Sequence, residues 1–200
     1  HPRGAFRGGR REGGAGTRLP PILSRYHAAN PGVVVELVTG TTGALVNRVM
    51  NFEIEAAFVS EPFNAAGLEA RPVFEEELVL VTPRALTRMQ GAADLGQSTL
   101  IAFANGCSYR KRLEDWLGSA NVMPQRILEF ASYQAMIACV SAGTGFAIVP
   151  QSVLAALRVG DEIRRHRLPA RYARNRTHLV WRGQPSLALQ SLLTVLAGED

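Results

Sequence analysis

The stretch VVVELVTGTTGALVNRVMN, residues 33–51, predicts a strand that passes directly into a helix. Val33–Val38 form a mostly branched, apolar run, which is typical of a strand buried on both faces of a parallel sheet. From Leu45 to Met50, apolar residues recur at helical spacing. The turn between these elements, residues 40–43, consists only of glycine and threonine. It is either a cradle for a small anion or a plain corner between strand and helix.

The same alternation of strands and helices extends over most of the chain. A helix is expected within residues 17–30 and a second buried strand at 54–60, which together predict an open α/β sheet with right-handed crossovers. After Pro83 the pattern starts again, so two similar α/β units are expected to join near residue 82. The last strand and helix return to the first unit. The predicted division is residues 17–81 with 177–200, and residues 82–176.

The first 16 residues, HPRGAFRGGRREGGAG, are rich in glycine and arginine and almost free of apolar side chains. We expect this segment to be disordered or foreign to the natural chain. Residues 1–18 contribute +4 of the formal net charge of +5, and eight further arginines cluster within residues 158–182. Because no groove-reading element accompanies either cluster, direct binding of DNA by this chain is not expected.

The two cysteines, Cys107 and Cys139, form no disulfide framework and fit a reducing compartment. No apolar run approaches the roughly 20 residues that cross a bilayer, and none near the start reads as a signal segment. These observations predict a cytoplasmic protein without a membrane partner.

No constellation for catalysis is visible in the sequence. Four histidines are scattered without metal-ligand spacing, at His1, His27, His166 and His178. The run Glu75-Glu76-Glu77 precedes a strand and is interpreted as a solvated edge. We therefore expect neither an enzyme nor a bound cofactor or metal. In SAGTGFAIVP, Gly143 and Gly145 are interpreted as a helix C-cap and a tight start of the next strand, not as a phosphate loop.

A second turn, Asn105-Gly106-Cys107-Ser108, repeats the first in the other unit. Each follows the carboxyl end of a strand and opens a helix, where open α/β sheets bind ligands and helix N-termini attract anions. Two equivalent turns favour an anion site over ordinary helix caps.

Three further side chains are candidates beside these turns. Ser132 is either a ligand contact or a plain N-cap, and Tyr133 either a contact or a packed rim residue. Phe103 forms either an apolar wall of the site or part of the core. Cys107 precedes Arg110 and Lys111 at a helix start, which are features that lower a thiol pKa, so a redox sensor is a separate hypothesis.

The chain resembles the effector-binding domain of LysR-type transcriptional regulators. The resemblance rests on TRLPPILSRYHAANPGVVVELVTGTTGALVNRVMNFEIEAAFVSEPF, then LEARPVFEEELVLVTP, then SAGTGFAIVPQSV, in this order and spacing. It implies a fold like that of type 2 periplasmic binding proteins, with two Rossmann-like subdomains, two crossover strands and an effector cleft. It also implies a small, usually anionic effector at Thr41, Thr42, Gly106, Cys107, Ser108, Ser132 and Tyr133, beside which Phe103 is the candidate apolar wall.

The resemblance further implies a homodimer, or a tetramer at full length, packed through helices within residues 19–30 and 110–118. The winged helix-turn-helix of that family has no counterpart here, so DNA is expected to be bound only through that missing domain. The first apolar strand of the family is also missing from the pattern, and Gly13-Gly14 stand in place of its hydroxyl residues. The alternatives are a periplasmic solute-binding protein of a transporter, a small α/β enzyme, and a thiol-based redox sensor through Cys107.

Overall fold

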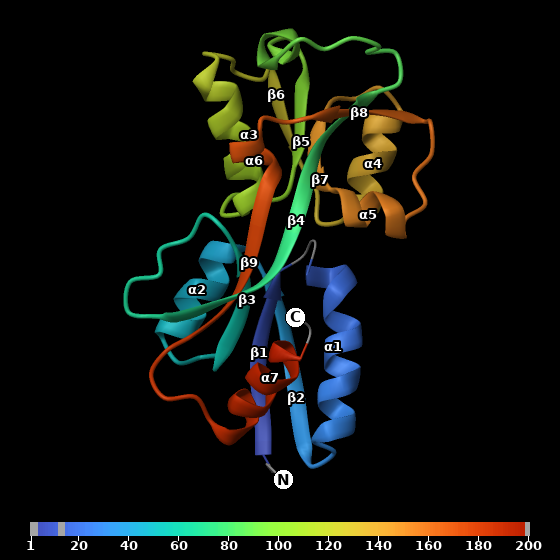
Figure 1. Ribbon diagram of the computed structural model, residues 1–200. Helices are drawn as coiled ribbons and strands as arrows, with labels where there is room; N and C mark the ends of the chain where they lie inside the picture. Colours follow the sequence, from blue (N-terminus) through green and yellow to red (C-terminus); the bar gives the residue numbers. More distant parts are fainter. Residues whose placement is uncertain (1–3, 12–14, 199–200) are drawn as a thin grey trace. The chain divides into compact units, whose positions relative to one another are not determined.

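The computed structural model describes residues 4–11 and 15–198 and divides the chain into two compact α/β units (Figure 1). Unit 1 contains the residues up to Glu75 and those from Arg176 onward, and unit 2 is Glu76–Asn175. The chain therefore crosses between the units twice, in β4 (Glu69–Pro83) and in β9 (Arg174–Trp181). The first crossing lies inside β4, earlier than the predicted joint near residue 82.

Unit 1 is a sheet with helices on both faces. Its strand order is β2 (Val33–Gly40), β1 (Gly4–Arg11), β3 (Ala56–Ser60) and β9, with β9 antiparallel to β3. Alternate residues of β3 face opposite sides. Ala56 and Phe58 pack with α1 (Ala15–Ala29) and α7 (Leu187–Ala197), whereas Ala57 and Val59 pack with α2 (Thr42–Met50).

The expectation for residues 1–16 needs correction, because residues 4–11 form β1. This strand pairs in parallel with β2 through the register Gly8↔Leu37 and with β3 through Gly8↔Ala56. A central strand is held by backbone hydrogen bonds to both neighbours, which need no apolar side chains. The sequence pattern therefore missed it. The remaining part of that prediction, at residues 1–3 and 12–14, lies outside the described residues, and so do Gly13 and Gly14.

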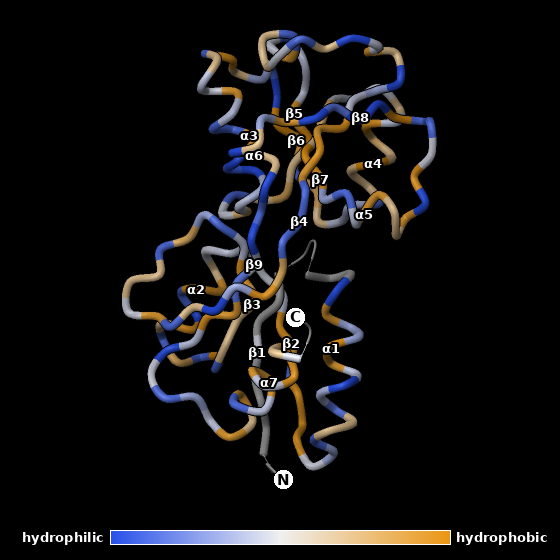
Figure 2. The backbone as a smooth tube through the Cα atoms, in the orientation of Figure 1, coloured by the Kyte–Doolittle hydropathy of each residue, from blue (hydrophilic) through white to orange (hydrophobic). Residues whose placement is uncertain are grey.

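Unit 2 combines a parallel strand pair with an antiparallel group. β5 (Thr99–Ala102) and β6 (Arg126–Glu129) are parallel, while β4 lies between β7 (Ala147–Pro150) and β8 (Ile163–Arg167). A parallel bridge between Leu100 and Phe146 connects the two groups. The remaining elements are η1 (Ala92–Leu95), α3 (Ser108–Ser119), α4 (Tyr133–Ser141), α5 (Gln151–Ala156) and α6 (Ala170–Ala173). In Figure 2, β7 is hydrophobic along its length and β8 is largely hydrophilic, in keeping with their burial.

Two expectations about the segment that forms β4 are wrong. The stretches LEARPVF and EEELVLVTP form one continuous strand of 15 residues, not two strands. Within it Glu75 and Glu77 are exposed, but Glu76 is buried on the face that also carries Phe74 and Leu78. The interpretation of the three glutamates as a solvated edge is therefore wrong for Glu76.

The interpretation of the two glycines after α4 is confirmed. Gly143 follows the C-cap Ala142 and has a φ of 86°, a left-handed conformation that glycine adopts without strain. Gly145 lies so close to β5 that a Cβ there would be 2.1 Å from the carbonyl oxygen of Thr99. Among the described helices, none combines the length and the apolar character needed to span a membrane.

Candidate functional site

The first candidate turn lies in unit 1, between β2 and α2. Thr41 is the N-cap of α2, and its hydroxyl oxygen accepts a hydrogen bond from the Ala44 amide at 3.3 Å. An N-cap hydroxyl that accepts in this way keeps its own proton for donation. Thr41 can therefore cap the helix and contact an anion at the same time.

Thr42 has a different environment from Thr41. Its side chain is buried, and its Oγ1 lies 3.4 Å from the amide nitrogen and 3.5 Å from the carbonyl oxygen of Ser60, the last residue of β3. The Ser60 hydroxyl lies in turn 3.2 Å from that of Thr177. Thr42 thus connects the start of α2 to the end of β3 by hydrogen bonds to Ser60, and in this way it holds the neighbouring Thr41 in position.

This geometry separates the roles of the two threonines. We expect Thr42→Val to lower the free energy of unfolding by about 1 kcal/mol, because an isosteric side chain removes the hydrogen bonds to Ser60 and keeps the volume. Anion affinity should stay within about twofold, since the hydroxyl faces β3. Equilibrium urea unfolding and calorimetric titration measure the two quantities. A loss of affinity with unchanged stability would instead make Thr42 a direct ligand contact.

The second candidate turn lies in unit 2, between β5 and α3. Gly106 has a φ of 90°, and its amide donates to the Asn105 side-chain oxygen at 2.9 Å. Cys107 is the N-cap of α3 and is buried, but its side chain makes no capping hydrogen bond. Ser108, the first residue of the helix, is 3% exposed. Within the part of the chain that the structure describes, its hydroxyl oxygen has no hydrogen-bond partner.

A third candidate position, the start of α4, lies beside this turn. Ser132 is the N-cap of α4, and its Oγ accepts from the Ala135 amide at 3.2 Å. The Tyr133 ring meets Phe103 edge-on, with centroids 4.8 Å apart and an interplanar angle of 86°. Since β5 and β6 are parallel, with Ala102 opposite Glu129, the residues that follow both strands meet at one edge of the sheet. The structure thus brings the unit 2 candidates together, while Thr41 and Thr42 belong to unit 1.

The cations expected to activate Cys107 are paired with carboxylates. Arg110 is 2.8 Å from Glu114 and also pairs with Glu129, and Lys111 is 3.1 Å from Asp115. The hydrogen bond that Arg110 donates to Glu114 is the main cause that raises the pKa of Arg110 above its ordinary value. Their charges are therefore balanced locally, and the redox hypothesis loses its electrostatic support. Glu129 could not be found from the sequence, because it lies on β6, 19 residues along the chain from its partner Arg110 on α3.

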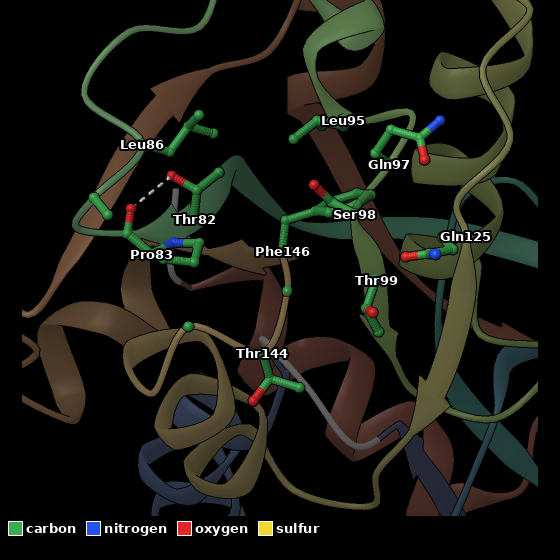
Figure 3. Close-up of a pocket in the computed structure, with 13 residues that line it drawn as sticks. Thr82, Pro83, Leu86, Leu95, Gln97, Ser98, Thr99, Gln125, Thr144 and Phe146 are labelled. Carbon is green, nitrogen blue, oxygen red and sulfur yellow. Dashed lines mark hydrogen bonds between the residues drawn. The ribbon is translucent and has the colours of Figure 1, made fainter.

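A shallow hollow of about 560 Å³ lies at the amino end of β5 (Figure 3). It is therefore at the opposite end of that strand from the turn at Gly106. Leu86, Leu95 and Phe146 supply its apolar part, and the polar side chains around it are uncharged: Thr82, Gln97, Ser98, Thr99, Gln125 and Thr144. No sequence signal pointed to it, and it lacks the charge or helix terminus that an anion requires. In the described ranges, no group of three or more histidine, cysteine, aspartate or glutamate residues could hold a metal ion.

Two histidines predict a pH dependence of stability. Burial lowers the pKa of His166 from its ordinary 6.5, and the charge of Arg164 lowers it further. Burial is also the main cause that lowers the pKa of His178. Below about pH 6.5 the unfolded chain therefore binds more protons than the folded chain, so this stability is present above pH 6.5 and is lost as the pH falls. Replacing both histidines with glutamine should flatten the unfolding free energy between about pH 7 and pH 5. An equal slope in the variant would contradict this assignment.

Comparisons with known proteins agree with this architecture. Residues 2–199 match the family model described as LysR substrate binding domain. The HTH-type transcriptional regulator GltR of Bacillus subtilis is 33% identical over 195 residues, which is 96% of this chain. The chain spans 66% of the length of that relative.

Two solved structures extend the comparison to proteins with bound ligands. The CcmR regulatory domain of Synechocystis, solved in complex with 2-PG, has a TM-score of 0.85 at 21% identity and covers 98% of this chain and 97% of its own. The effector binding domain of QuiR, solved with shikimate, has a TM-score of 0.79 at 17% identity and covers 98% of this chain and 96% of its own. These likenesses confirm the expected periplasmic-binding-protein-like α/β fold.

Proposed function

Because the chain belongs to the family of LysR substrate-binding domains, which are parts of transcriptional regulators, we propose that it senses a small anionic effector. The proposed contacts are Thr41 in unit 1 and, in unit 2, Phe103, Gly106, Cys107, Ser108, Ser132 and Tyr133. Thr42 acts there by holding Thr41 in place. Binding would shift the balance between two arrangements of the units, to the extent that the effector prefers one of them.

The observation that carries this proposal is the buried hydroxyl of Ser108. A hydroxyl removed from water and left without a hydrogen bond is costly, so native proteins rarely keep one without a reason. This one lies in the first turn of α3, where backbone N–H groups and the helix dipole favour negative charge. An anion that accepts a hydrogen bond from Ser108 would satisfy the hydroxyl.

The class of effector follows from the neighbouring side chains. Phe103 and Tyr133 form an apolar wall beside the turn, which suits a small organic acid with a carbon skeleton. The ligands found on the two related regulatory domains, 2-PG and shikimate, are both organic acids. We therefore favour a carboxylate or phosphate ester over a neutral or cationic effector.

A thermal-shift panel tests the proposal. With reductant present, the chain is heated with sulfate, 2-phosphoglycolate or shikimate, and with glycerol as a neutral control. Binding at about 100 times the dissociation constant should stabilise the fold by roughly 2.7 kcal/mol, a shift of several degrees. A rise in melting temperature with the anions and not with glycerol supports the proposal. A response to glycerol alone would contradict it.

We also propose that the chain forms a homodimer, and a tetramer at full length, through helices within residues 19–30 and 110–118. Exposed apolar side chains on nearby strands favour such packing: Val34 and Leu37 on the edge strand β2, and Ile127 on β6. Val34→Glu should raise the dimer dissociation constant at least about tenfold in sedimentation experiments, because burying an unpaired charge is costly. A wild-type chain that stays monomeric at high concentration would contradict this assignment.

The remaining parts of the proposal concern the whole regulator. DNA binding is assigned to the winged helix-turn-helix that the family carries outside this domain, and the regulator is placed in the cytoplasm. The related GltR is a transcriptional regulator and not an enzyme, and we propose the same for this chain. Turnover of a bound effector would favour the enzyme alternative, and a transporter genetically linked to the chain would favour the solute-binding alternative.

A further inference from the structure

A buried carboxylate lies where the chain enters unit 2. Glu76, the first residue of that unit, is 7% exposed. Its carboxylate accepts hydrogen bonds from the Tyr109 hydroxyl at 2.7 Å and from the Ser152 hydroxyl at 3.3 Å. A buried carboxylate is costly unless it is well hydrogen-bonded, so this one indicates a junction with a specific geometry.

The same tyrosine reaches the residue where the chain leaves unit 2. The side-chain nitrogen of Asn175, the last residue of the unit, donates to the Tyr109 hydroxyl at 3.4 Å. One turn further along α3, on the same face, the Arg112 guanidinium donates to the carbonyl oxygens of Arg174 at 2.8 Å and Arg171 at 3.4 Å. Both strands that cross between the units are thus tied to α3 through hydrogen bonds from within unit 2.

Tyr109 also follows Ser108 directly. The first turn of α3 therefore contains both the unpartnered hydroxyl of Ser108 and the tyrosine that is hydrogen-bonded to Glu76. The bond of 2.7 Å from a phenol to a carboxylate is charge-assisted, and such bonds are shorter and stronger than bonds between neutral groups. A displacement of the start of α3 that carries Tyr109 along would therefore strain the hydrogen bond to β4.

We infer that Glu76 and Tyr109 are positioning residues that hold the turn Gly106–Ser108 in register with the two crossing strands. This inference rests on the proposed function, and it identifies the hydrogen bonds that connect the proposed effector site to the crossing strands β4 and β9. Glu76 and Tyr109 touch no effector themselves. They fix the distance between the anion-binding turn and the points where the chain enters and leaves unit 2.

Cys107 supplies a test that needs no effector. Cys107 as a residue is 4% exposed, so we expect its thiol to react with Ellman's reagent only after the turn opens locally. Tyr109→Phe keeps the ring and removes the hydroxyl, and should make Cys107 react about tenfold faster or more. Cys139, on α4, is an internal reference whose rate should not change. Tyr172→Phe is the matched control, because no hydrogen bond to the Tyr172 hydroxyl is described in unit 2.

A double-mutant cycle separates a specific pair from general loosening. In Tyr109→Phe the Glu76 side chain loses its nearest hydrogen-bond donor, whereas Glu76→Gln is uncharged and of equal size. If the two residues act as a pair, Tyr109→Phe accelerates Cys107 at least about threefold less in the Glu76→Gln background. Equal acceleration in both backgrounds, or an equal rise for Cys139, would overturn the inference. Circular dichroism of each variant shows whether it is folded. If Tyr109→Phe does not fold, the rate of Cys107 modification in Glu76→Gln alone tests the junction.

The link to the effector is measured separately with 2-phosphoglycolate. A positioning role predicts at least about fivefold weaker binding to Tyr109→Phe, and unchanged binding to Tyr172→Phe, by calorimetric titration. If the wild-type chain binds none of the anions while Cys107 behaves as expected, the proposed function fails and the junction stands. If the wild type binds and the Cys107 rates do not change, the inference alone is overturned.

Discussion

Replacing Gly145 with alanine is expected to lower the free energy of unfolding by about 3 kcal/mol or more. The new Cβ would lie 2.1 Å from the carbonyl oxygen of Thr99 and 2.9 Å from its carbonyl carbon. Both are backbone atoms of β5, and the same carbonyl accepts the Phe146 amide at 3.0 Å. No flexible side chain can move aside, so β5 must shift or the hydrogen bond must break. Either response disturbs the strand that leads to the turn at Gly106.

Gly43 provides the matched control for this experiment. It lies in the first turn of α2, and a Cβ there would meet nothing within 4 Å. Gly43→Ala should therefore leave stability unchanged or raise it by up to about 1 kcal/mol, because alanine favours helix. Equilibrium urea unfolding compares the two variants. A Gly145→Ala variant as stable as the wild type would mean that β5 and the segment before β7 are not packed as described.

Removing the Ser108 hydroxyl should have the largest effect on effector binding. Hydrogen bonds to charged groups contribute about 1.5–3 kcal/mol, so Ser108→Ala should weaken 2-phosphoglycolate binding about tenfold to hundredfold. The fold itself should not lose stability, since this buried oxygen has no partner among the described residues. Affinity and stability are therefore expected to respond differently to one substitution.

Ser119, at the other end of α3, is the control for Ser108. Its hydroxyl donates to the Trp116 carbonyl oxygen at 2.7 Å, and it lies at the end of the helix that repels anions. Ser119→Ala should change stability slightly and leave affinity intact. Calorimetric titration of both variants, together with urea unfolding, makes the comparison. Equal affinities for Ser108→Ala and the wild type would remove Ser108 from the effector site.

Much of the fold could be predicted, because burial gives strands and helices a recognisable spacing of apolar residues. Apolar runs marked β3 and β7, which are buried, and helical spacing marked α2 and α3. The apolar run of β2 also marked a strand, but its expected burial on both faces is wrong, because β2 is an edge strand with Val34 and Leu37 exposed. β1 could not be found in this way, because glycine and arginine give no apolar signal and backbone pairing alone places the strand. Glu76 shows the reverse limit: it shares the buried face of β4 with Phe74 and Leu78, but a glutamate in the sequence suggested exposure to solvent.

The candidate site could be predicted only to the level of its turns. Strand ends followed by small polar residues indicated where Thr41 and Ser108 would lie. The different surroundings of Thr42 and Ser108 depend on which backbone groups another strand presents, and the local sequence does not encode those. The same reason explains why Tyr109 was missed, since its partners Glu76 and Asn175 are far away along the chain.

Hydrogen exchange of the wild-type chain, with and without saturating 2-phosphoglycolate, tests the central claim most directly. We expect slower exchange of the amides in residues 41–44 and 106–110, at the starts of α2 and α3. Amides around the hollow at residues 143–146 should keep their rates. Slower exchange confined to that hollow, or no change at either helix start when binding is saturated, would contradict the assignment of the effector site.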